Sequence, residues 1–448
     1  MIRKSSDSFL NKNLCYFKKS HQISQLILFS LLLINLLFIS CSPTKRFTEK
    51  EVKKDNTETN ESLKYPKEEK SESEINFSKI RVSMQGLIPG ESLIIGSRVF
   101  IYKDNNRIAF AGEGNLVKCF FMNGQIKLEI GEQEFYGEQF FLVSAESEEI
   151  ININGKRYRG RIQVSSTNSS ISLVNILNLN DYVKGVLAKE MPLGKNVENF
   201  EALKALAVCI RTYALQKMND KKLYFDIYAD TRDQVYGGVD VESQVSNKAA
   251  DETNNLLLKY NGIPATIYYH STCGGITEAA VNVFTNKEIP YLISIEDGDV
   301  PNCKISPRFM WEEKYSKELI VERLKKYSLL DNQYYKLKNF SILSRFESGR
   351  VDELEIILTD ERDAEKSILI RGNEIRSIIR TADGKNILWS TMFDVSMNSN
   401  AITLSGKGFG HGVGLCQWGA IALSNKGWSY EEILNLYYPG TIAEKIND

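Results

Sequence analysis

The residue best suited to acid–base chemistry in this sequence is Glu190. Asp181 is a favourable helix N-cap and Pro192 stops a helix, so we expect a helix over residues 181–190. Valine or leucine precedes Glu190 by three, four and seven positions, which places its carboxyl on the apolar face of that helix. A carboxyl held against apolar surface is desolvated and its pKa rises, as a general acid near neutral pH requires. The alternative is a carboxylate at a helix end that bends outward to water.

Two cations lie in the next expected helix, over about residues 200–218. The run 202–210 is apolar except for Lys204, so this helix is expected to be buried on nearly all sides. Lys204 and Arg211 are seven residues apart, share one face and need anionic partners if buried. Either they pair with acidic side chains, or they line a cleft and contact Glu190 or an anionic substrate. A cation against Glu190 would lower its pKa and oppose the general-acid role.

A polar loop over residues 224–239 carries Gln234 and Tyr236, and a strand end follows it. An apolar strand is predicted to deliver His270 and Ser271 into a Gly-Gly turn, and strand ends commonly carry sites. Neighbouring side chains on a strand point to opposite faces, so His270 and Ser271 do not form a catalytic dyad by adjacency. A serine hydrolase is therefore disfavoured.

Glycines alternate through residues 405–420, which allows the backbone to approach a ligand or another chain closely. His411 is expected to be exposed among these glycines. The adjacent Gln417 and Trp418 suggest a platform on which an aromatic ring stacks against a sugar. The segment is not a dinucleotide-binding loop, because no βαβ unit follows it and no acidic residue stands at the required distance.

The N-terminus carries the pattern of a targeting segment. Basic residues precede an apolar run that is too short for a membrane span, and residues 1–41 end at Ser40-Cys41. This resembles a bacterial lipoprotein cleavage site with lipid on Cys41, and the rival is an uncleaved signal anchor. Residues 42–76 are polar and are predicted to be a disordered tether. We therefore expect an extracytoplasmic protein held at a membrane.

The remaining chain predicts an α+β fold, with a β-rich part packed on a mixed α/β domain that contains a cleft. Period-two alternation and turn residues mark the β-rich part, where Asn154-Gly155 is a plausible hairpin turn, and Ser429 with Glu432 forms a capping box before the last helix. The expected parts are a β-rich domain over 77–178, the first part of the core over 179–310, an inserted lobe over 311–400, and a completing segment over 401–448.

Composition excludes two classes of function. The net charge of −1, from 56 Lys+Arg and 57 Asp+Glu, gives no polycationic signature for nucleic acid. The 3 histidines are too few for a His-rich metal centre. At 448 residues the chain is long enough for two or three domains with real cores.

Five ordered motifs resemble those of the SpoIID family, which contains the stage II sporulation protein D and the amidase enhancers. They are Asp-Tyr-Val-Lys-Gly-Val-Leu-Ala-Lys-Glu-Met-Pro, Glu-Ala-Leu-Lys-Ala-Leu-Ala-Val-Cys-Ile-Arg-Thr-Tyr-Ala, Asp-Gln-Val-Tyr-Gly-Gly, Tyr-His-Ser-Thr-Cys-Gly-Gly-Ile-Thr-Glu and Gly-His-Gly-Val-Gly-Leu-Cys-Gln-Trp-Gly-Ala. The resemblance runs from about residue 80 to 440. It implies lytic transglycosylation of peptidoglycan glycan strands, with the family's catalytic glutamate at Glu190.

A lytic reaction needs only one carboxyl, because the substrate's own 6-hydroxyl replaces water. Glu190 would protonate the glycosidic oxygen and then deprotonate that hydroxyl. The residues expected to bind substrate are Lys204, Arg211, Gln234, Tyr236, His270, Ser271, Gly274, Gly275, His411, Gly412, Gln417 and Trp418. One rival is a non-catalytic module that binds glycan or enhances a cell-wall amidase, a possible partner. Another is a hydrolase whose second carboxylate is Asp230 or Asp233.

No cofactor is expected. Some family members bind zinc through cysteines near the Asp-Thr segment, but residues 226–238 contain no Cys, so that metal is not expected here. Cys273 and Cys303 leave three alternatives open: a disulfide, free thiols, or an incomplete zinc site together with His270.

Overall fold

The structure is a computed structural model that describes residues 79–87, 92–112, 114–167, 169–192, 199–219 and 224–446. Cys41, the predicted signal peptide and the predicted tether over 42–76 lie outside these ranges. Within the described ranges, no helix has both the length and the apolar character needed to span a membrane. The described residues from 79 to 178 form strands, and both helices and strands follow, so the predicted α+β class is confirmed.

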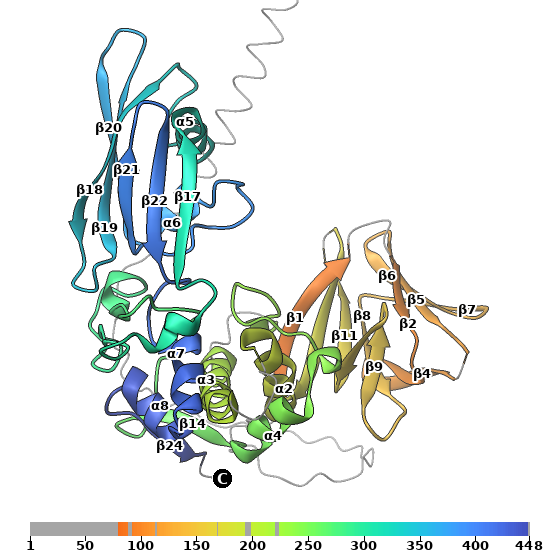
Figure 1. Ribbon diagram of the computed structural model, residues 1–448. Coiled ribbons are helices and arrows are strands. Elements are labelled where there is room, and N and C mark those ends of the chain that lie inside the picture. Colours follow the sequence, from red (N-terminus) through yellow and green to blue (C-terminus); the bar gives the residue numbers. More distant parts are fainter. Residues whose placement is uncertain are drawn as a thin grey trace, which may run out of the picture. The chain divides into compact units, whose positions relative to one another are not determined.

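The N-terminal part is built from two sheets (Figure 1). The first has the order β13-β1-β12-β11-β8-β3-β4, from β1 (Lys79–Leu87), β3 (Val99–Lys103), β4 (Asn106–Ala111), β8 (Gln139–Ser144), β11 (Arg161–Ser166), β12 (Ile171–Asn178) and β13 (Ile227–Tyr228). The second has the order β10-β9-β2-β5-β6-β7, from β2 (Ser92–Ile95), β5 (Val117–Met122), β6 (Gln125–Ile130), β7 (Gln133–Gly137), β9 (Ile150–Ile153) and β10 (Lys156–Arg159).

These two sheets share one hydrophobic core. Ile95 and Leu128 of the second sheet belong to the same buried cluster as Leu142 and Ile162 of the first. Alternate residues of each strand point inward, as the period-two pattern predicts. The predicted hairpin turn is confirmed, because Ile153 pairs with Lys156 across Asn154 and Gly155, which have φ values of 48° and 80°. Two positive φ values are what a type I′ turn requires.

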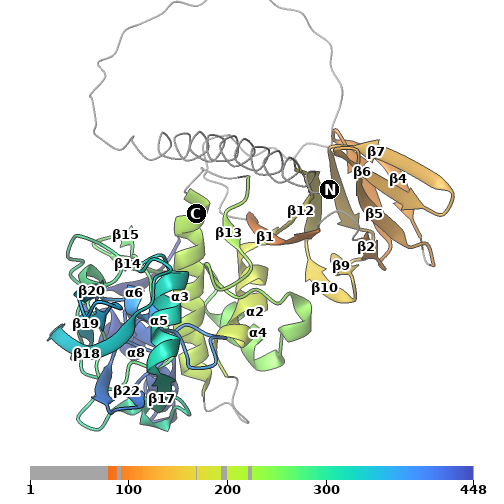
Figure 2. The ribbon, with the colours of Figure 1, turned by 90° about the horizontal axis from the view of Figure 1, so that it is seen from above.

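A helical core follows, and its central element is α3 (Phe200–Asn219). Residues 205–210 of α3 are fully buried, so the predicted all-round burial of this helix is confirmed. Figure 2 shows α3 beside α2 and α4. The other elements of this part are α2 (Leu179–Glu190), α4 (Gln244–Glu252), α7 (Gln417–Asn425), α8 (Tyr430–Tyr437), β14 (Leu256–Tyr260), β15 (Ile263–Pro264), β16 (Tyr269–His270), β23 (Leu415–Cys416) and β24 (Ile442–Lys445).

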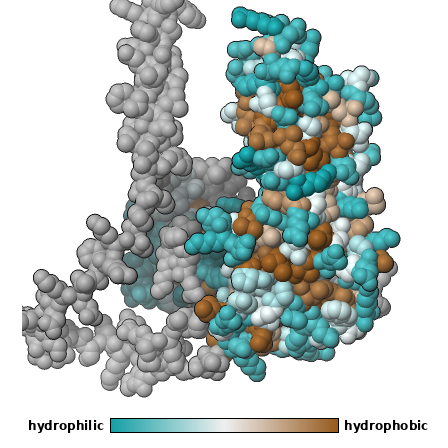
Figure 3. All heavy atoms as spheres, turned by 90° about the vertical axis from the view of Figure 1, so that its left-hand side faces the viewer, coloured by the Kyte–Doolittle hydropathy of each residue, from teal (hydrophilic) through white to brown (hydrophobic). Residues whose placement is uncertain are grey.

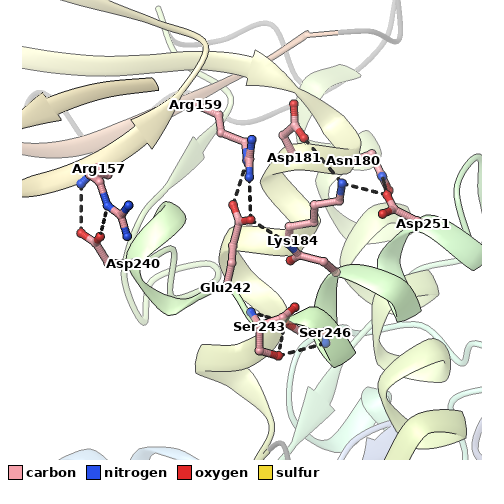
Figure 4. Close-up of polar contacts among 11 residues, drawn as sticks. Arg157, Arg159, Asn180, Asp181, Lys184, Asp240, Glu242, Ser243, Ser246 and Asp251 are labelled. Carbon is pink, nitrogen blue, oxygen red and sulfur yellow. Dashed lines mark hydrogen bonds and ion pairs between the residues drawn. The ribbon is translucent and has the colours of Figure 1, made fainter. Parts of the chain in front are cut away.

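The β-rich part and the helical core are joined by both backbone and side chains. Strand β12 leads directly into α2, and β13 pairs in parallel with β1. Arg157 pairs with Asp240 at 2.7 Å, and Arg159 pairs with Glu242 at 2.8 Å (Figure 4). Asp240 lies in a short 3₁₀ helix, η2 (Val239–Val241). The loop that carries Gln234 and Tyr236 is therefore fastened at both ends.

A lobe with its own core lies between the two halves of the helical core in sequence. It contains the sheets β17-β22-β21 and β18-β19-β20 and two helices. The elements are β17 (Met310–Ser316), α5 (Lys317–Lys326), β18 (Lys336–Arg345), β19 (Val351–Thr359), β20 (Glu365–Arg371), α6 (Glu374–Ile379), β21 (Phe393–Met397) and β22 (Ala401–Lys407). In Figure 3, hydrophobic residues gather in two zones, one at the height of this lobe and one at the height of the helical core.

Candidate functional site

Glu190 is the last residue of α2. The apolar face formed by Val183, Val186 and Leu187 is fully buried, and Glu190 follows on the same face. The predicted N-cap was wrong: Asn178 occupies that position, and Asp181 lies in the first turn. A negative charge there is favourable because backbone N–H groups of the helix start are free. The helix ends as predicted, because Met191 is extended and precedes a proline.

The carboxyl of Glu190 is half-buried and turned inward. Its Oε1 accepts a 2.7 Å hydrogen bond from the backbone N–H of Val235. Burial raises the pKa of Glu190 above its usual value, while hydrogen bonds from Val235 and the Gln417 side chain partly offset the rise. The alternative in which this carboxylate bends outward to water is therefore wrong.

Polar side chains from three segments surround this carboxyl. The Tyr182 hydroxyl donates a 3.0 Å hydrogen bond to Oε1 of Gln234. Burial, with the Glu190 charge contributing, raises the pKa of both Tyr182 and Tyr269 well above the usual range. Nε2 of Gln234 and the hydroxyl of Tyr269 are buried and make no close hydrogen bond among the described residues, although the Gln234 side chain lies near enough to the Tyr269 hydroxyl to lower its pKa slightly. Buried donors of this kind are costly unless a ligand or water satisfies them.

The two histidines form a second group around the pairing of β16 with β23. Nδ1 of His270 lies 3.1 Å from the carbonyl oxygen of Val413, so it carries the proton and leaves Nε2 as an acceptor. That Nε2 is buried and has no partner in the described part of the chain. The ring centroids of His270 and His411 are 5.5 Å apart. Because strand neighbours alternate, Tyr269 belongs to the Glu190 group and His270 to the His411 group.

His411 was expected to be exposed, but the structure shows that it is not. Its ring is half-buried, with centroids 4.8 Å from Phe284 and 6.2 Å from Tyr268. Burial, with Arg376 nearby, lowers the pKa of His411 to about 3, and burial lowers the pKa of His270 well below its usual range. Both imidazoles are therefore neutral at physiological pH.

The glycines of the Gly-rich segment make room for the protein's own chain. A Cβ on Gly412, whose φ is +88°, would lie 2.5 Å from Cζ of Arg350. Arg350 is buried and donates a 2.6 Å hydrogen bond to the carbonyl oxygen of Cys273. A Cβ on Gly410 would lie 2.7 Å from Cβ of His270. At both positions the close neighbour is a residue of this same chain, not a ligand or a second chain.

The remaining expected binding residues lie around the start of α7. The backbone N–H of Trp418 donates a 3.0 Å hydrogen bond to the carbonyl oxygen of Ser271, and both side chains are half-buried. Gly274 and Gly275 adopt φ values of +81° and +118°. Gln417 begins α7 directly after β23, and this position brings its amide to Glu190.

Lys204 has partners other than Glu190. Its Nζ lies 2.9 Å from Glu201 and 4.6 Å from the ring centroid of Tyr430. It therefore follows the first alternative, in which the cation pairs with an acidic side chain.

Arg211 is 1% exposed and is held by uncharged acceptors. Its Nη2 donates to Oδ1 of Asn180 at 2.9 Å and to the carbonyl oxygen of Ala250 at 3.1 Å. Asn180 in turn donates to Asp251, which also pairs with Lys184 at 2.8 Å (Figure 4). The guanidinium is thus enclosed by protein groups, and its contacts with the described residues do not include Glu190, which one of the two alternatives required.

Tyr236 also lies in the core. It is 8% exposed, its ring stacks on Tyr182 with centroids 5.4 Å apart, and its hydroxyl donates a 2.8 Å hydrogen bond to Oδ1 of Asn175. Gly185 leaves room for this ring, because a Cβ there would lie 2.4 Å from Cε2 of Tyr236. These contacts give Tyr236 a packing role beside the Glu190 group.

Neither alternative second carboxylate is free. Asp233 accepts hydrogen bonds from the Tyr213 hydroxyl at 2.7 Å and the Tyr228 N–H at 2.9 Å, and it pairs with Lys217 at 2.9 Å. Burial alone would raise the pKa of Asp233, but these donors outweigh it and hold the pKa below the usual value. Asp230 is exposed and pairs with Arg232 at 2.6 Å.

Four buried side chains in this half of the molecule could hold a metal. They are Cys273, Asp297, Cys303 and Cys416, whose ligand atoms all lie within 4.8 Å of one another. The sulfurs of Cys273 and Cys303 are 3.4 Å apart and unbonded. Cys273 and Cys303 therefore lie close together. The other members of the cluster are Cys416 and Asp297, and His270 is not among them.

Two hollows in the surface lie away from Glu190. One of about 720 Å³ is lined by Phe200, Glu201, Val245, Lys248, Ser424, Asn425 and Gly427. Another of about 700 Å³ lies along β17, β21 and β22. Residues 193–198, which follow the Glu190 helix closely, are outside the described ranges.

Comparison with known proteins identifies the group to which the chain belongs. The family profile described as stage II sporulation protein, SpoIID, matches residues 167–260, which include α2, α3 and the polar loop. An uncharacterised protein of Brachyspira hyodysenteriae is 32% identical over 347 residues, which cover 77% of this chain and 86% of that protein. The chain belongs to the SpoIID family.

Two SpoIID relatives carry functional names. The amidase enhancer of Bacillus subtilis is 31% identical over 289 residues, covering 58% of this chain and 40% of that protein. The stage II sporulation protein D of the same organism is 27% identical over 285 residues, covering 60% of this chain and 75% of that protein. A profile for a domain of unknown function matches residues 270–414, which include the His-Ser turn, the lobe and most of the Gly-rich segment.

Proposed function

We propose that this protein is a peptidoglycan lytic transglycosylase in which Glu190 acts first as acid and then as base. The observation that carries the proposal is the state of the Glu190 carboxyl. Burial raises its pKa, and the two groups that hydrogen-bond to it, the Val235 N–H and Gln417, are both uncharged. Such a carboxyl can hold a proton near neutral pH and can also be stabilised after giving it up.

The reaction would proceed in two proton transfers. Glu190 gives its proton to the glycosidic oxygen as the bond from that oxygen to C1 breaks. The 6-hydroxyl of the same muramyl residue then attacks C1, and the Glu190 carboxylate takes the proton from this hydroxyl. The product carries a 1,6-anhydro ring, and Glu190 is again protonated. No second carboxylate is needed, which agrees with the internal partners of Asp233.

Substrate positioning is assigned to donors near the carboxyl. Nε2 of Gln234 and the hydroxyl of Tyr269 are buried and only loosely paired with each other, so a sugar hydroxyl or acetamido group would complete their hydrogen bonding. Gln417 would hold the carboxylate formed after the first transfer. In this scheme Tyr236 and Arg211 support the site through packing.

The setting proposed for this reaction is the cell envelope. The predicted signal peptide and Cys41 support a chain anchored outside the cytoplasm by lipid, and the relatives' names support a role at the cell wall. The partners would be glycan strands, the membrane and a cell-wall amidase.

A second function is favoured by the likeness to the amidase enhancer. In that case the protein would bind glycan and stimulate an amidase without cleaving strands. Stimulation of a purified N-acetylmuramoyl-L-alanine amidase by both wild type and Glu190→Gln, with no glycan cleavage by either, would support this alternative.

The reaction class is tested by mass spectrometry of the products released from peptidoglycan, both intact and stripped of stem peptides. A lytic enzyme gives muramyl ends that are lighter by one water than the reducing ends left by a hydrolase. Anhydro ends from wild type support the proposal. Reducing ends alone would establish a hydrolase, and no cleavage with retained binding to glycan would establish the non-catalytic function.

A further inference from the structure

The cluster of three thiols and one carboxyl unites segments that are far apart in sequence. Cys273 lies in the turn after β16, and Cys416 ends β23 and caps α7. Cys303 lies in a 3₁₀ helix, η4 (Asn302–Ile305), and Asp297 lies in the loop before it. All four side chains are buried, with exposures of 0%. They are separate from residues 226–238, the segment in which zinc was not expected.

We propose that Cys273, Asp297, Cys303 and Cys416 bind one Zn²⁺ ion as a closed structural site. The four ligand atoms lie within 4.8 Å of one another. Tetrahedral zinc with Zn–S bonds of about 2.3 Å separates two sulfur ligands by about 3.8 Å. The 3.4 Å between the sulfurs of Cys273 and Cys303 is near that value and far from the bond length of a disulfide, about 2.0 Å.

Backbone donors around the sulfurs fit metal-bound thiolates. The N–H groups of Cys273 and Gly419 point at Sγ of Cys416, at 3.2 and 3.4 Å. The N–H of Gly275 points at Sγ of Cys273 at 3.4 Å. Hydrogen bonds to the ligand atoms orient them and stabilise their charge, and metal sites commonly have such outer partners.

Asp297 is oriented in the same way. Its Oδ1 accepts a 2.6 Å hydrogen bond from the Tyr437 hydroxyl, and its Oδ2 accepts a 2.7 Å hydrogen bond from the N–H of Cys303. A carboxylate oxygen has more than one lone pair, so each oxygen can still bind a metal. Tyr437 therefore completes an outer shell around the fourth ligand.

The content of the cluster favours zinc over the other states of these cysteines. A single disulfide within the chain would use two of the three thiols and leave the third unpaired. Oxidation of the sulfurs would also give the buried carboxyl beside them no stabilising partner. Thiolates are soft ligands that select zinc or iron in a tetrahedral site. Four protein ligands leave no open position for a substrate, so the ion would be structural. It would cross-link the turn after β16, the loop before η4 and the start of α7.

The test uses the full-length chain purified without chelators. Metal content is measured by plasma mass spectrometry, free thiols by titration, and disulfides by peptide mapping. We expect about one zinc per chain in wild type and a loss of at least about tenfold in Cys303→Ser. Cys119→Ser is the matched control, because Cys119 is a buried free cysteine in the β-rich part, and it should keep its zinc.

A second measurement uses only the wild-type protein, so its result does not depend on whether a variant folds. After removal of zinc and addition of Co²⁺, we expect the intense near-ultraviolet absorption of cobalt bound to thiolate, with visible bands of tetrahedral cobalt. Zinc added back should abolish these bands. A chain without zinc that shows a Cys273–Cys303 disulfide, or that gives no thiolate–cobalt absorption, would overturn the proposal.

Discussion

The backbone N–H of Val235 donates a 2.7 Å hydrogen bond to Oε1 of Glu190, and this contact ties the end of α2 to the polar loop that follows β13. The same loop supplies Gln234, whose buried Nε2 makes no close hydrogen bond among the described residues. This backbone contact therefore partly offsets the rise that burial causes in the pKa of Glu190, and it holds Gln234 next to the carboxyl. The contribution of Gln417 to that acidity comes from α7, at the other end of the chain.

Replacing Gln417 by Leu should move the alkaline limb of the pH–rate profile to higher pH. The Gln417 side chain stabilises the charged form of Glu190 and lowers its pKa, so its loss lets the pKa rise further. A general acid works only while protonated, so activity then persists to higher pH, although the maximal rate falls. Rates measured across pH for wild type, Gln417→Leu and the distant control Gln139→Leu test this. If the alkaline limb of Gln417→Leu falls at the same pH as in wild type, or at a lower pH, the prediction is wrong.

Asp230→Asn and Asp233→Asn should both still form anhydro ends. Asp230 is exposed and paired with Arg232, and Asp233 is held by Tyr213 and Lys217. We expect Asp233→Asn to lose about 1–2 kcal/mol of unfolding free energy, because it weakens an ion pair and hydrogen bonds. Activity is compared at equal concentrations of folded protein. Loss of turnover in either variant, without loss of fold, would favour the two-carboxylate hydrolase.

Arg211→Met should destabilise the protein by about 2–4 kcal/mol, since it leaves buried carbonyl and amide oxygens without donors. Lys204→Met, the matched change seven residues earlier, should cost under about 1 kcal/mol, because that amine makes a partly exposed pair with Glu201. Denaturant unfolding gives both values. Glycan binding per folded molecule should be unchanged in each. Weakened binding by stable Arg211→Met would restore the expected role in substrate contact.

The two neutral histidines should make the protein lose stability in mild acid. The pKa of His411 is lowered from an ordinary 6.5 to about 3, so the unfolded chain binds more protons between these values. This contribution to stability is fully present above pH 6.5 and is lost as pH falls toward 3. The decrease in melting temperature from pH 7 to pH 5 should be smaller in His411→Gln than in wild type. Equal decreases would show that His411 is charged in the folded protein.

Local chemistry predicted much of this fold. The Asn154-Gly155 turn, the apolar face of α2 and the Ser429 capping box depend on neighbours within a few residues, and each is confirmed. Long-range partners could not be predicted. The hydroxyl of Tyr236 finds Asn175 across 61 residues of sequence, and Cys273 meets Cys416 across 143. Sequence shows that such groups need partners, while only the packing of segments decides which ones they receive.

The same limit explains the residues that were missed. Tyr182 belongs to the same motif as Glu190, and Tyr269 directly precedes His270 in another motif. The helical period for Tyr182 and the strand alternation for Tyr269 were the signals that could have predicted where these side chains point. Asp297 has no pattern around it that separates it from other loop acids. The glycine at 412 was recognised as a place of close approach, but the occupant, Arg350, comes from the lobe.

The most direct test of the central claim compares the release of anhydromuramyl ends by wild type and Glu190→Gln. Glu201→Gln is the control on the neighbouring helix, and melting temperature and glycan pull-down confirm that all three proteins are folded and bind. Glu190 as acid and base predicts a fall of about 10²–10⁴-fold in Glu190→Gln with binding retained, and little change in Glu201→Gln. Turnover by Glu190→Gln within about twofold of wild type would contradict the account.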